Sequence, residues 1–158
     1  MTVNRGKQFE AKFQQDRNVS FPGSFCLRVP DQQSGYYGTS RNICDFICFA
    51  EQTLFLIECK TIKGNTFPLA NFTQYDKMAS VKEYPHVKAG ILIWYYEKDK
   101  VVFVPLDTYK KMLDAEEKSI NVRYLVDKYP ELGYNIVEIP SKKKRVFMDS
   151  DYTILLEE

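Results

Sequence analysis

Two carboxylates and a lysine interrupt two consecutive apolar runs in the first half of the chain. Asp45 lies within residues 43–49, whereas Glu58 and Lys60 lie within residues 54–60. Both runs are apolar enough to form β-strands that are covered on two sides. A charge inside such a strand destabilises the fold unless another charge, a metal ion or a ligand compensates it. These three residues are therefore the first candidates for a functional site.

The two runs are expected to pair as an antiparallel hairpin. Phe49 opposite Leu54 would close this hairpin, with residues 50–53 as its loop. That register sets Asp45 opposite Glu58, with their Cβ atoms ~5 Å apart. One divalent cation could then bind both carboxylates and cancel their mutual repulsion.

Lys60 follows Glu58 by two residues, so strand alternation places both side chains on one face. The ammonium group can hold an attacking water or neutralise a phosphorane-like transition state. Carboxylate oxygens together with a backbone carbonyl, here that of Cys59, favour Mg²⁺ or Mn²⁺ over zinc. The pattern predicts a metal-dependent nuclease. The alternative reading of the same residues is a structural ion-pair network at the end of a sheet.

The length of 158 residues predicts a single nuclease domain that spans residues 1–158. Hydrophobic residues make up 44% of the chain, which excludes a disordered protein and favours a folded α/β (α+β) domain. No apolar run approaches the length of a membrane span, and no secretion signal precedes residue 5. We therefore expect no membrane partner and a cytoplasmic location, in a bacterium or a phage-infected host cell.

The cysteines are expected to be reduced core thiols. A zinc site would need a second pair of ligands, and His86 is the only histidine. The four cysteines instead fall inside expected strands, where a free thiol packs as a small apolar group. They are Cys26, Cys44, Cys48 and Cys59.

Basic residues gather locally, although the net charge is only +1. Residues 142–145 are all Lys or Arg, and residues 5–17 contain four more basic residues. Such patches can bind phosphate in a nearly neutral protein, although many runs of this kind are solvated loops. Lys143 within the run and Lys63 after the second apolar run are candidate contacts to DNA.

The order of the expected elements predicts a mixed central sheet flanked by helices. Residues 4–17 are expected to form a helix capped by Asn4, and residues 69–83 a helix capped by Asn71. Further helices are expected at 106–117 and 122–128. Besides the hairpin, strands are expected at 25–29, 90–96, 101–105, 134–139 and 153–156.

The spacing of Asp45 and Glu58-Cys59-Lys60 resembles the core of the PD-(D/E)xK nuclease superfamily. The segment 66–72, with Gln74 and Met78 after it, is similar to the RecU-type Holliday junction resolvases. The opening Asn4-Arg5-Gly6, followed by Glu10, is similar to the same family. The resemblance covers most of residues 4–105. It implies a restriction-endonuclease-like fold, a homodimer, dependence on Mg²⁺ or Mn²⁺, and symmetric incision of branched double-stranded DNA at four-way junctions.

The resemblance also implies roles for individual residues. Asp45 and Glu58 would bind the metal, and Lys60 would act on the nucleophilic water or the scissile phosphate. Gln74 would orient the site from the following helix, although matching it requires a short deletion and Asp76 is the ungapped alternative. The first-helix acid Glu10 would hold the metal through a water. Arg5 would contact the DNA backbone.

The chain departs from the family between the first strand and Asp45. RecU proteins carry a long stalk there that inserts into the centre of the junction, and this chain has only residues 30–41. Tyr36, Tyr37 and Arg41 could stack on unpaired bases from this shorter segment. Two other functions therefore stay open, a nuclease that tolerates several DNA structures and a non-catalytic DNA-binding accessory protein in recombination.

Overall fold

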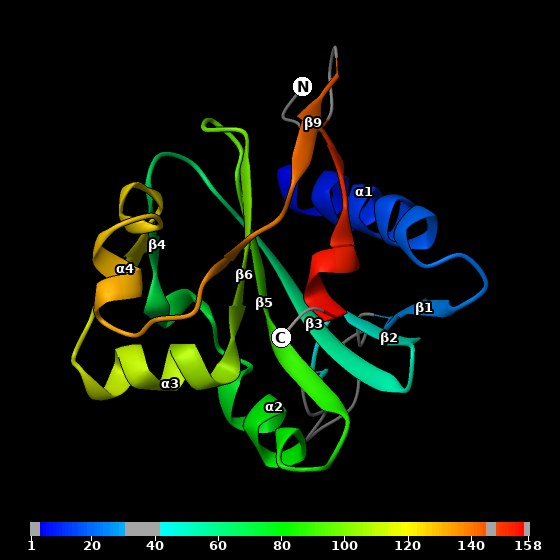
Figure 1. Cartoon of the computed structure of the whole chain (residues 1–158), viewed down its shortest axis with the longest axis horizontal. Coiled ribbons are helices and arrows are strands. Elements are labelled where there is room, and N and C mark those ends of the chain that lie inside the picture. The colour runs from blue at the N-terminus through cyan, green and yellow to red at the C-terminus, as the bar shows by residue number, and fades with distance from the viewer. Residues whose placement is uncertain (1–3, 31–41, 145–147, 157–158) are drawn as a thin grey trace, which may run out of the picture.

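The computed structural model describes residues 4–30, 42–144 and 148–156, and its elements are labelled in Figure 1. The helices are α1 (Arg5–Ser20), α2 (Tyr75–Lys82), α3 (Leu106–Asp114) and α4 (Lys128–Glu131). The longer strands are β1 (Phe25–Arg28), β2 (Phe46–Ala50), β3 (Thr53–Ile62), β5 (Val87–Tyr95) and β6 (Lys100–Pro105). The shorter strands are β4 (Thr66–Pro68), β7 (Ser119–Asn121), β8 (Val137–Glu138), β9 (Ser141–Lys143) and β10 (Met148–Ser150). Three 3₁₀ helices cover Leu69–Asn71, Val122–Tyr124 and Tyr152–Leu156.

Six strands form one mixed sheet in the order β1-β2-β3-β5-β6-β8. The pairs β1–β2, β2–β3 and β5–β6 are antiparallel, whereas β3 and β5 are parallel. A parallel pair needs a crossover connection, and here the crossover runs through β4 and α2. The structure therefore confirms the predicted α/β class and the mixed central sheet.

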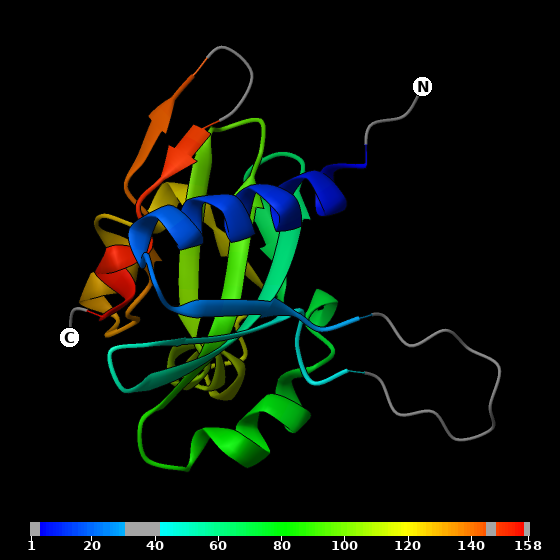
Figure 2. The same cartoon turned by 90° about the vertical axis from the view of Figure 1, so that its right-hand side faces the viewer.

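Helices cover both faces of this sheet. Phe9 and Phe13 of α1 pack on one face, in an apolar core that also contains Phe46. Met78 of α2 and Tyr109 of α3 belong to the apolar core on the other face. Figure 1 shows α1 on one side of the sheet and α3 and α4 on the other, and Figure 2 shows α1 crossing the strands. β3 is consequently covered on both faces, as its apolar run predicts.

The predicted register of the β2–β3 hairpin is confirmed, because Phe49 pairs with Leu54. The loop is shorter than expected, since Ala50 and Thr53 also pair and leave two residues in the turn. Glu51 and Gln52 have φ values of 48° and 66°. Left-handed conformations at both central positions are typical of the type I′ turn, whose twist matches that of the flanking strands.

The first helix begins as predicted. The Asn4 side chain accepts a hydrogen bond from the Lys7 backbone N–H at 3.0 Å, which caps α1. The helix continues to Ser20, three residues beyond the predicted end. Phe9 and Phe13 are both buried, so they form the predicted apolar stripe.

The second helix begins later than predicted, at Tyr75 rather than at residue 69, and Asn71 does not cap it. Residues 66–68 instead pair with β7, and the Leu69 N–H donates to the Lys118 carbonyl at 3.0 Å. Buried Leu69 and Phe72 hold the following turn against α3. Tertiary contacts therefore override the helical pattern of this segment.

Two further expectations about secondary structure were wrong, and a third, the strand at 134–139, is confirmed only at Val137–Glu138. The segment 122–128 is not one helix: Val122–Tyr124 is a 3₁₀ helix at which the Asn121 side chain accepts from the Arg123 N–H, residues 125–127 form a turn, and α4 begins at Lys128. Residues 153–156 are not a strand but part of the 3₁₀ helix Tyr152–Leu156. The Asp151 side chain accepts from the Thr153 N–H at 3.0 Å and starts this helical turn.

None of the helices within the described ranges has the length and apolar character that crossing a membrane requires.

Candidate active site

The β2–β3 hairpin brings the two predicted acids together. Asp45 immediately precedes β2, and its N–H donates to the Ile57 carbonyl at 3.1 Å. Its carboxylate oxygen Oδ2 accepts a hydrogen bond from the Cys59 N–H at 2.9 Å. Glu58 lies in the middle of β3, and the neighbouring Asp45 carboxyl raises the pKa of the Glu58 carboxyl. The backbone of β3 thus fixes one acid against the other.

Glu58 lies in an unfavourable environment for a lone carboxylate. Its side chain is buried, with 2% of the residue exposed, and its oxygen Oε2 has no hydrogen-bond partner in the described part of the chain. Burial and the Asp45 carboxyl raise the pKa of the Glu58 carboxyl to about 9. The neighbouring ammonium group of Lys60 acts in the opposite direction. At neutral pH, the pair therefore holds a proton or requires a compensating cation.

This environment fits a divalent cation. A positive ion between Asp45 and Glu58 would supply a partner for the orphan oxygen Oε2 and cancel the repulsion that raises the pKa. Across residues 4–30, 42–144 and 148–156, no three His, Cys, Asp or Glu side chains converge on one point. Any remaining ligands would come from the Cys59 carbonyl, from water or from a phosphate.

Lys60 lies two residues after Glu58 on β3, and it is partly exposed. The position combines a cation with access to solvent next to the buried Glu58 and the partly exposed Asp45. An ammonium group placed in this way can contact a water molecule or an anionic ligand that approaches the acids.

Arg28 is the residue of this site that the sequence pattern did not identify. Its atoms Nε and Nη2 both lie 3.0 Å from Oε2 of Glu10, and Nη2 lies 4.0 Å from Oδ1 of Asp45. Its guanidinium also packs over the Phe46 ring. Arg28 ends β1 and pairs with Phe46, so the strand order places it beside Asp45. The sequence shows Arg28 as a charged residue at the end of an expected strand. Only the pairing of β1 with β2 shows that this residue lies beside Asp45.

The structure brings Glu10 to the edge of the site. Glu10 comes from α1, on the face of the sheet covered by Phe9 and Phe13, and its ion pair with Arg28 links it to Asp45. Its charge also contributes to the raised pKa of Glu58. Side chains from α1, β1, β3 and the residue before β2 therefore form one cluster.

Gln74 is not brought to the acid pair by any described contact. It precedes the first residue of α2, and its side chain contacts Thr73 at 3.2 Å. The alternative residue Asp76 is exposed on α2. The later start of α2 leaves Gln74 at the N-cap position and Asp76 in the first turn, whereas both were expected inside the helix.

The predicted DNA contacts within the described residues come from three elements, α1, the turn after β3, and β9. Arg5 packs over the ring of Tyr96 with 5.2 Å to its centroid, Lys63 is exposed after β3, and Lys143 pairs with Asp99 at 2.8 Å. Three more candidates, Tyr36, Tyr37 and Arg41, lie outside the described residues.

The chain matches one protein family and is similar to a solved structure. The sequence profile of the family described as RecU, Recombination protein U, matches residues 29–140, which is more than half of the chain. No curated protein matches the sequence. One similar solved structure is that of Hjc, a Holliday junction resolvase from the archaeal hyperthermophile Archaeoglobus fulgidus. It is 16% identical, the match covers 67% of this chain and 78% of that chain, and the TM-score is 0.46.

The acid pair predicts a distinct pH dependence of stability in the metal-free protein. The pKa of the Glu58 carboxyl is raised from its ordinary value of 4.5 to about 9 in the folded protein. Between about pH 5 and pH 9 this carboxyl therefore keeps a proton in the folded state that it loses in the unfolded state. The free energy of unfolding should fall as the pH rises through this range. Glu58→Gln should remove the fall and stabilise the protein at pH 8 by on the order of 2 kcal/mol. Urea unfolding with a chelator present measures both effects.

Glu131→Gln is the matched control, because Glu131 is exposed on α4. It should retain the pH dependence of the wild-type protein. If the free energy of unfolding of the Glu58→Gln variant falls as steeply with pH as that of the wild-type protein, the pH dependence does not come from Glu58.

Proposed function

The chain belongs to the recombination protein U family, and from that premise we propose that it is a metal-dependent endonuclease that nicks four-way DNA junctions symmetrically. Residues 1–158 would act as one nuclease domain, and branched double-stranded DNA in the cytoplasm of a bacterium or a phage-infected cell would be the substrate. The observation that carries the proposal is the orphan oxygen of buried Glu58 beside the Asp45 carboxyl.

The acid pair and the Cys59 carbonyl would hold Mg²⁺ or Mn²⁺. Such an ion, when bound, lowers the pKa of a water molecule and neutralises charge on a phosphate. The hydrogen bond from the Cys59 N–H fixes the orientation of the Asp45 carboxylate before substrate arrives. Pre-orientation of this kind favours hydrolysis, because the charged groups need not rearrange in the transition state.

Lys60 and Arg28 would complete the chemistry. The ammonium group of Lys60 would hold the attacking water, or stabilise the negative charge that develops on the phosphate oxygens. Arg28 orients Asp45 and Glu10 through its two contacts, and Glu10 would act on the metal site through a water. For Gln74, a catalytic role would require α2 to approach the acids when DNA binds.

Replacing Lys60 separates cleavage from binding. Lys60→Ala should reduce the rate of nicking a labelled four-way junction by about 100-fold or more, because transition-state charge loses its partner. Junction affinity should change little, and chelation of divalent ions should abolish nicking by the wild-type protein. Lys118→Ala, at an exposed lysine in the described chain, is the matched control and should cut normally.

The same assay decides between the three functions. Equal cleavage of a junction and a linear duplex would favour the nuclease that tolerates several structures. If the protein binds junctions but does not nick them with any of the divalent ions tested, the result would favour the accessory protein and contradict the nuclease proposal.

We further propose that a basic arm contacts DNA phosphates. The arm is the β9–β10 hairpin with its exposed residues Lys142, Lys143 and Lys144. Strand β10 of the arm is bound to α1, because Asp149 forms an ion pair with Lys12 at 2.6 Å and the Ser150 N–H donates to Asp16 at 3.0 Å. The lysines are therefore presented on a supported hairpin.

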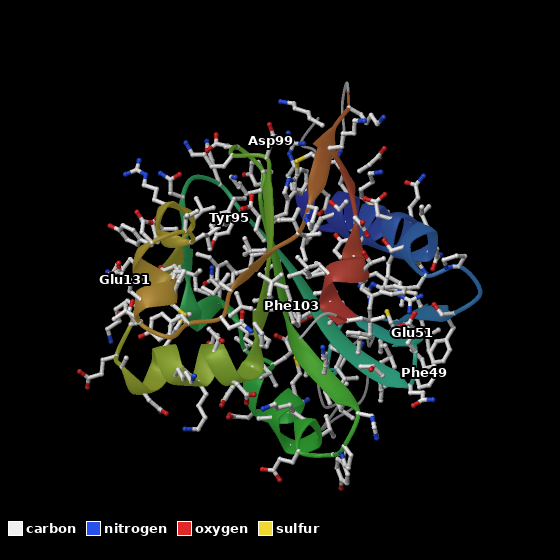
Figure 3. All side chains as sticks on the ribbon, in the orientation of Figure 1. Phe49, Glu51, Tyr95, Asp99, Phe103 and Glu131 are labelled. Carbon is white, nitrogen blue, oxygen red and sulfur yellow. The ribbon has the colours of Figure 1, made fainter. Side chains whose placement is uncertain are left out.

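Other basic residues extend this surface. Lys143 reaches Asp99 at the tip of the β5–β6 turn, which Figure 3 shows at the same end of the molecule as the arm. Arg5 lies at the start of α1, and Lys63 lies in the turn after β3. Both would contact the backbone of the same DNA. Tyr36, Tyr37 and Arg41 would stack on unpaired bases.

The arm should affect binding through its charge. The double variant Lys142→Ala/Lys143→Ala should weaken junction binding and lower the slope of log K against log salt by about two, because each lysine is expected to neutralise one phosphate. Fluorescence anisotropy with a labelled junction measures this slope at several salt concentrations.

Lys110→Ala/Lys111→Ala makes the same charge change on α3. Figure 1 shows α3 at the opposite end of the molecule from β9. This control should keep the wild-type slope. Equal decreases of the slope in both double variants would indicate a general charge effect and contradict a contact by the arm.

A second copy of the chain is the proposed partner that makes the nicks symmetric. Two related active sites on opposite strands call for a two-fold dimer. On the edge strand β1, Phe25 is 53% exposed to solvent and Leu27 is 56% exposed. Phe49, which lies next to Phe25 on β2, is 41% exposed. Phe25 and Phe49 stack at 6.1 Å, and Figure 3 shows Phe49 at the outer end of the hairpin. A continuous apolar strip on an edge strand favours association with another protein surface.

Disrupting this strip tests the dimer. The wild-type protein should have the mass of a dimer by light scattering, and Phe25→Ser/Leu27→Ser should reduce it to that of a monomer, because polar side chains remove the apolar contact. Paired nicking should disappear with the dimer. Val126→Ser/Leu132→Ser, which changes two other exposed apolar residues, should remain dimeric. A monomeric wild-type protein that still makes paired nicks would refute the dimer.

A further inference from the structure

Cys26 and Cys48 face one another across the β1–β2 pair. The two residues are direct partners in the antiparallel register, and their sulfur atoms lie 2.9 Å apart, with the Cys48 thiol donating to Cys26. The Val29 N–H donates to the Asp45 carbonyl at 2.8 Å. Hydrogen-bonded and non-hydrogen-bonded pairs alternate along such a ladder, so Cys26 and Cys48 form a non-hydrogen-bonded pair. The Cα atoms of such pairs are about 4.5 Å apart, which lies within the range that a disulfide spans.

The surroundings make the two sulfurs unequal. Cys26 is partly exposed on the edge strand, whereas Cys48 is buried in the core beneath α1. The hydrogen bond from Cys48 lowers the pKa of Cys26, and the nearby guanidinium of Arg17 acts in the same direction. Arg17 is held in place by the Phe49 carbonyl at 3.0 Å. One cysteine is thus partly exposed at the sheet edge, and the sulfur of the other lies against it from the core.

We propose that Cys26 and Cys48 form a peroxide-sensitive thiol pair that closes into a disulfide between β1 and β2. The sulfur of Cys26 attacks hydrogen peroxide, so that an S–O bond forms, the O–O bond breaks and one water leaves. The sulfur of Cys48 then attacks the sulfur of Cys26, an S–S bond forms, and the S–O bond breaks. The departing hydroxyl takes the proton of the Cys48 thiol and leaves as a second water. Two thiols are oxidised and one peroxide is reduced.

The disulfide would restrain the strand that carries Arg28. β1 has four residues and lies at the edge of the sheet, where β2 is its one partner among the described strands. Arg28 follows Cys26 by two residues and contacts both Glu10 and Asp45. Closing the bond ties this strand covalently to β2, at a position next to the acid cluster. The side chains of Phe25 and Leu27 point to the opposite face of β1, so the proposed dimer surface stays separate from the thiols.

The test uses the full chain treated with hydrogen peroxide under native conditions. The intact mass should fall by about 2 Da, the loss of two hydrogens, and a non-reducing peptide map should contain Cys26 joined to Cys48. The oxidised protein should also unfold at a Tm about 5 °C higher, because the cross-link restricts the unfolded chain. Dithiothreitol should reverse both changes. These readouts do not depend on nuclease activity, so they stand or fall separately from the proposed function.

Variants identify the pair. Cys26→Ser and Cys48→Ser should each prevent the loss of mass, whereas Cys44→Ala and Cys59→Ala should keep the cross-link between residues 26 and 48. A map that joins Cys26 to Cys59, or that finds Cys26 carrying two oxygens while Cys48 remains a thiol, would overturn the proposal. An unchanged or lower Tm after oxidation would show that the bond does not fit the native sheet. The wild-type peptide map remains decisive if a variant fails to fold.

Discussion

The contact between the carboxyl groups of Asp45 and Glu58 is the interaction on which the candidate site depends. It follows from the register of the β2–β3 hairpin, which a two-residue turn with left-handed Glu51 and Gln52 fixes. A slip of one residue would move every side chain of β2 to the other face of the sheet. The Cys59 N–H then holds the Asp45 carboxylate at the edge of β3. A local turn thereby determines the geometry of a charged cluster.

Burial gives this contact its chemical character. β3 lies between β2 and β5 and is covered by α1 on one face and by α2 and α3 on the other. The same coverage that stabilises the sheet removes water from Glu58 and raises its pKa. An acid pair at the surface would be solvated and would need no cation. The apolar core and the affinity expected for a divalent ion therefore have the same physical origin.

The edge strand β1 connects the acid pair to the rest of the molecule. It carries Arg28 into the cluster on one side and exposes Phe25 and Leu27 on the other. Its pairing with β2 also sets Cys26 against Cys48. A four-residue strand thus combines a charge that orients the acids, an apolar surface that fits a second copy and a thiol pair. An edge strand is suited to this combination because only one of its sides is fixed by the sheet.

The sequence by itself determined what depends on short-range pattern. The apolar runs with their three interrupting charges predicted the hairpin, its register and the acid pair, because strand alternation and turn closure act over a few residues. Other short segments, residues 66–72 with Gln74 and Met78 and the opening Asn4-Arg5-Gly6, carried the resemblance to the family whose profile matches residues 29–140. Only the tertiary structure decided how distant segments meet. Arg28 joins the site through β1–β2 pairing, and α2 starts late because Leu69 and Phe72 are buried. Such outcomes are set by packing against elements far away in the chain, and no local pattern encodes them.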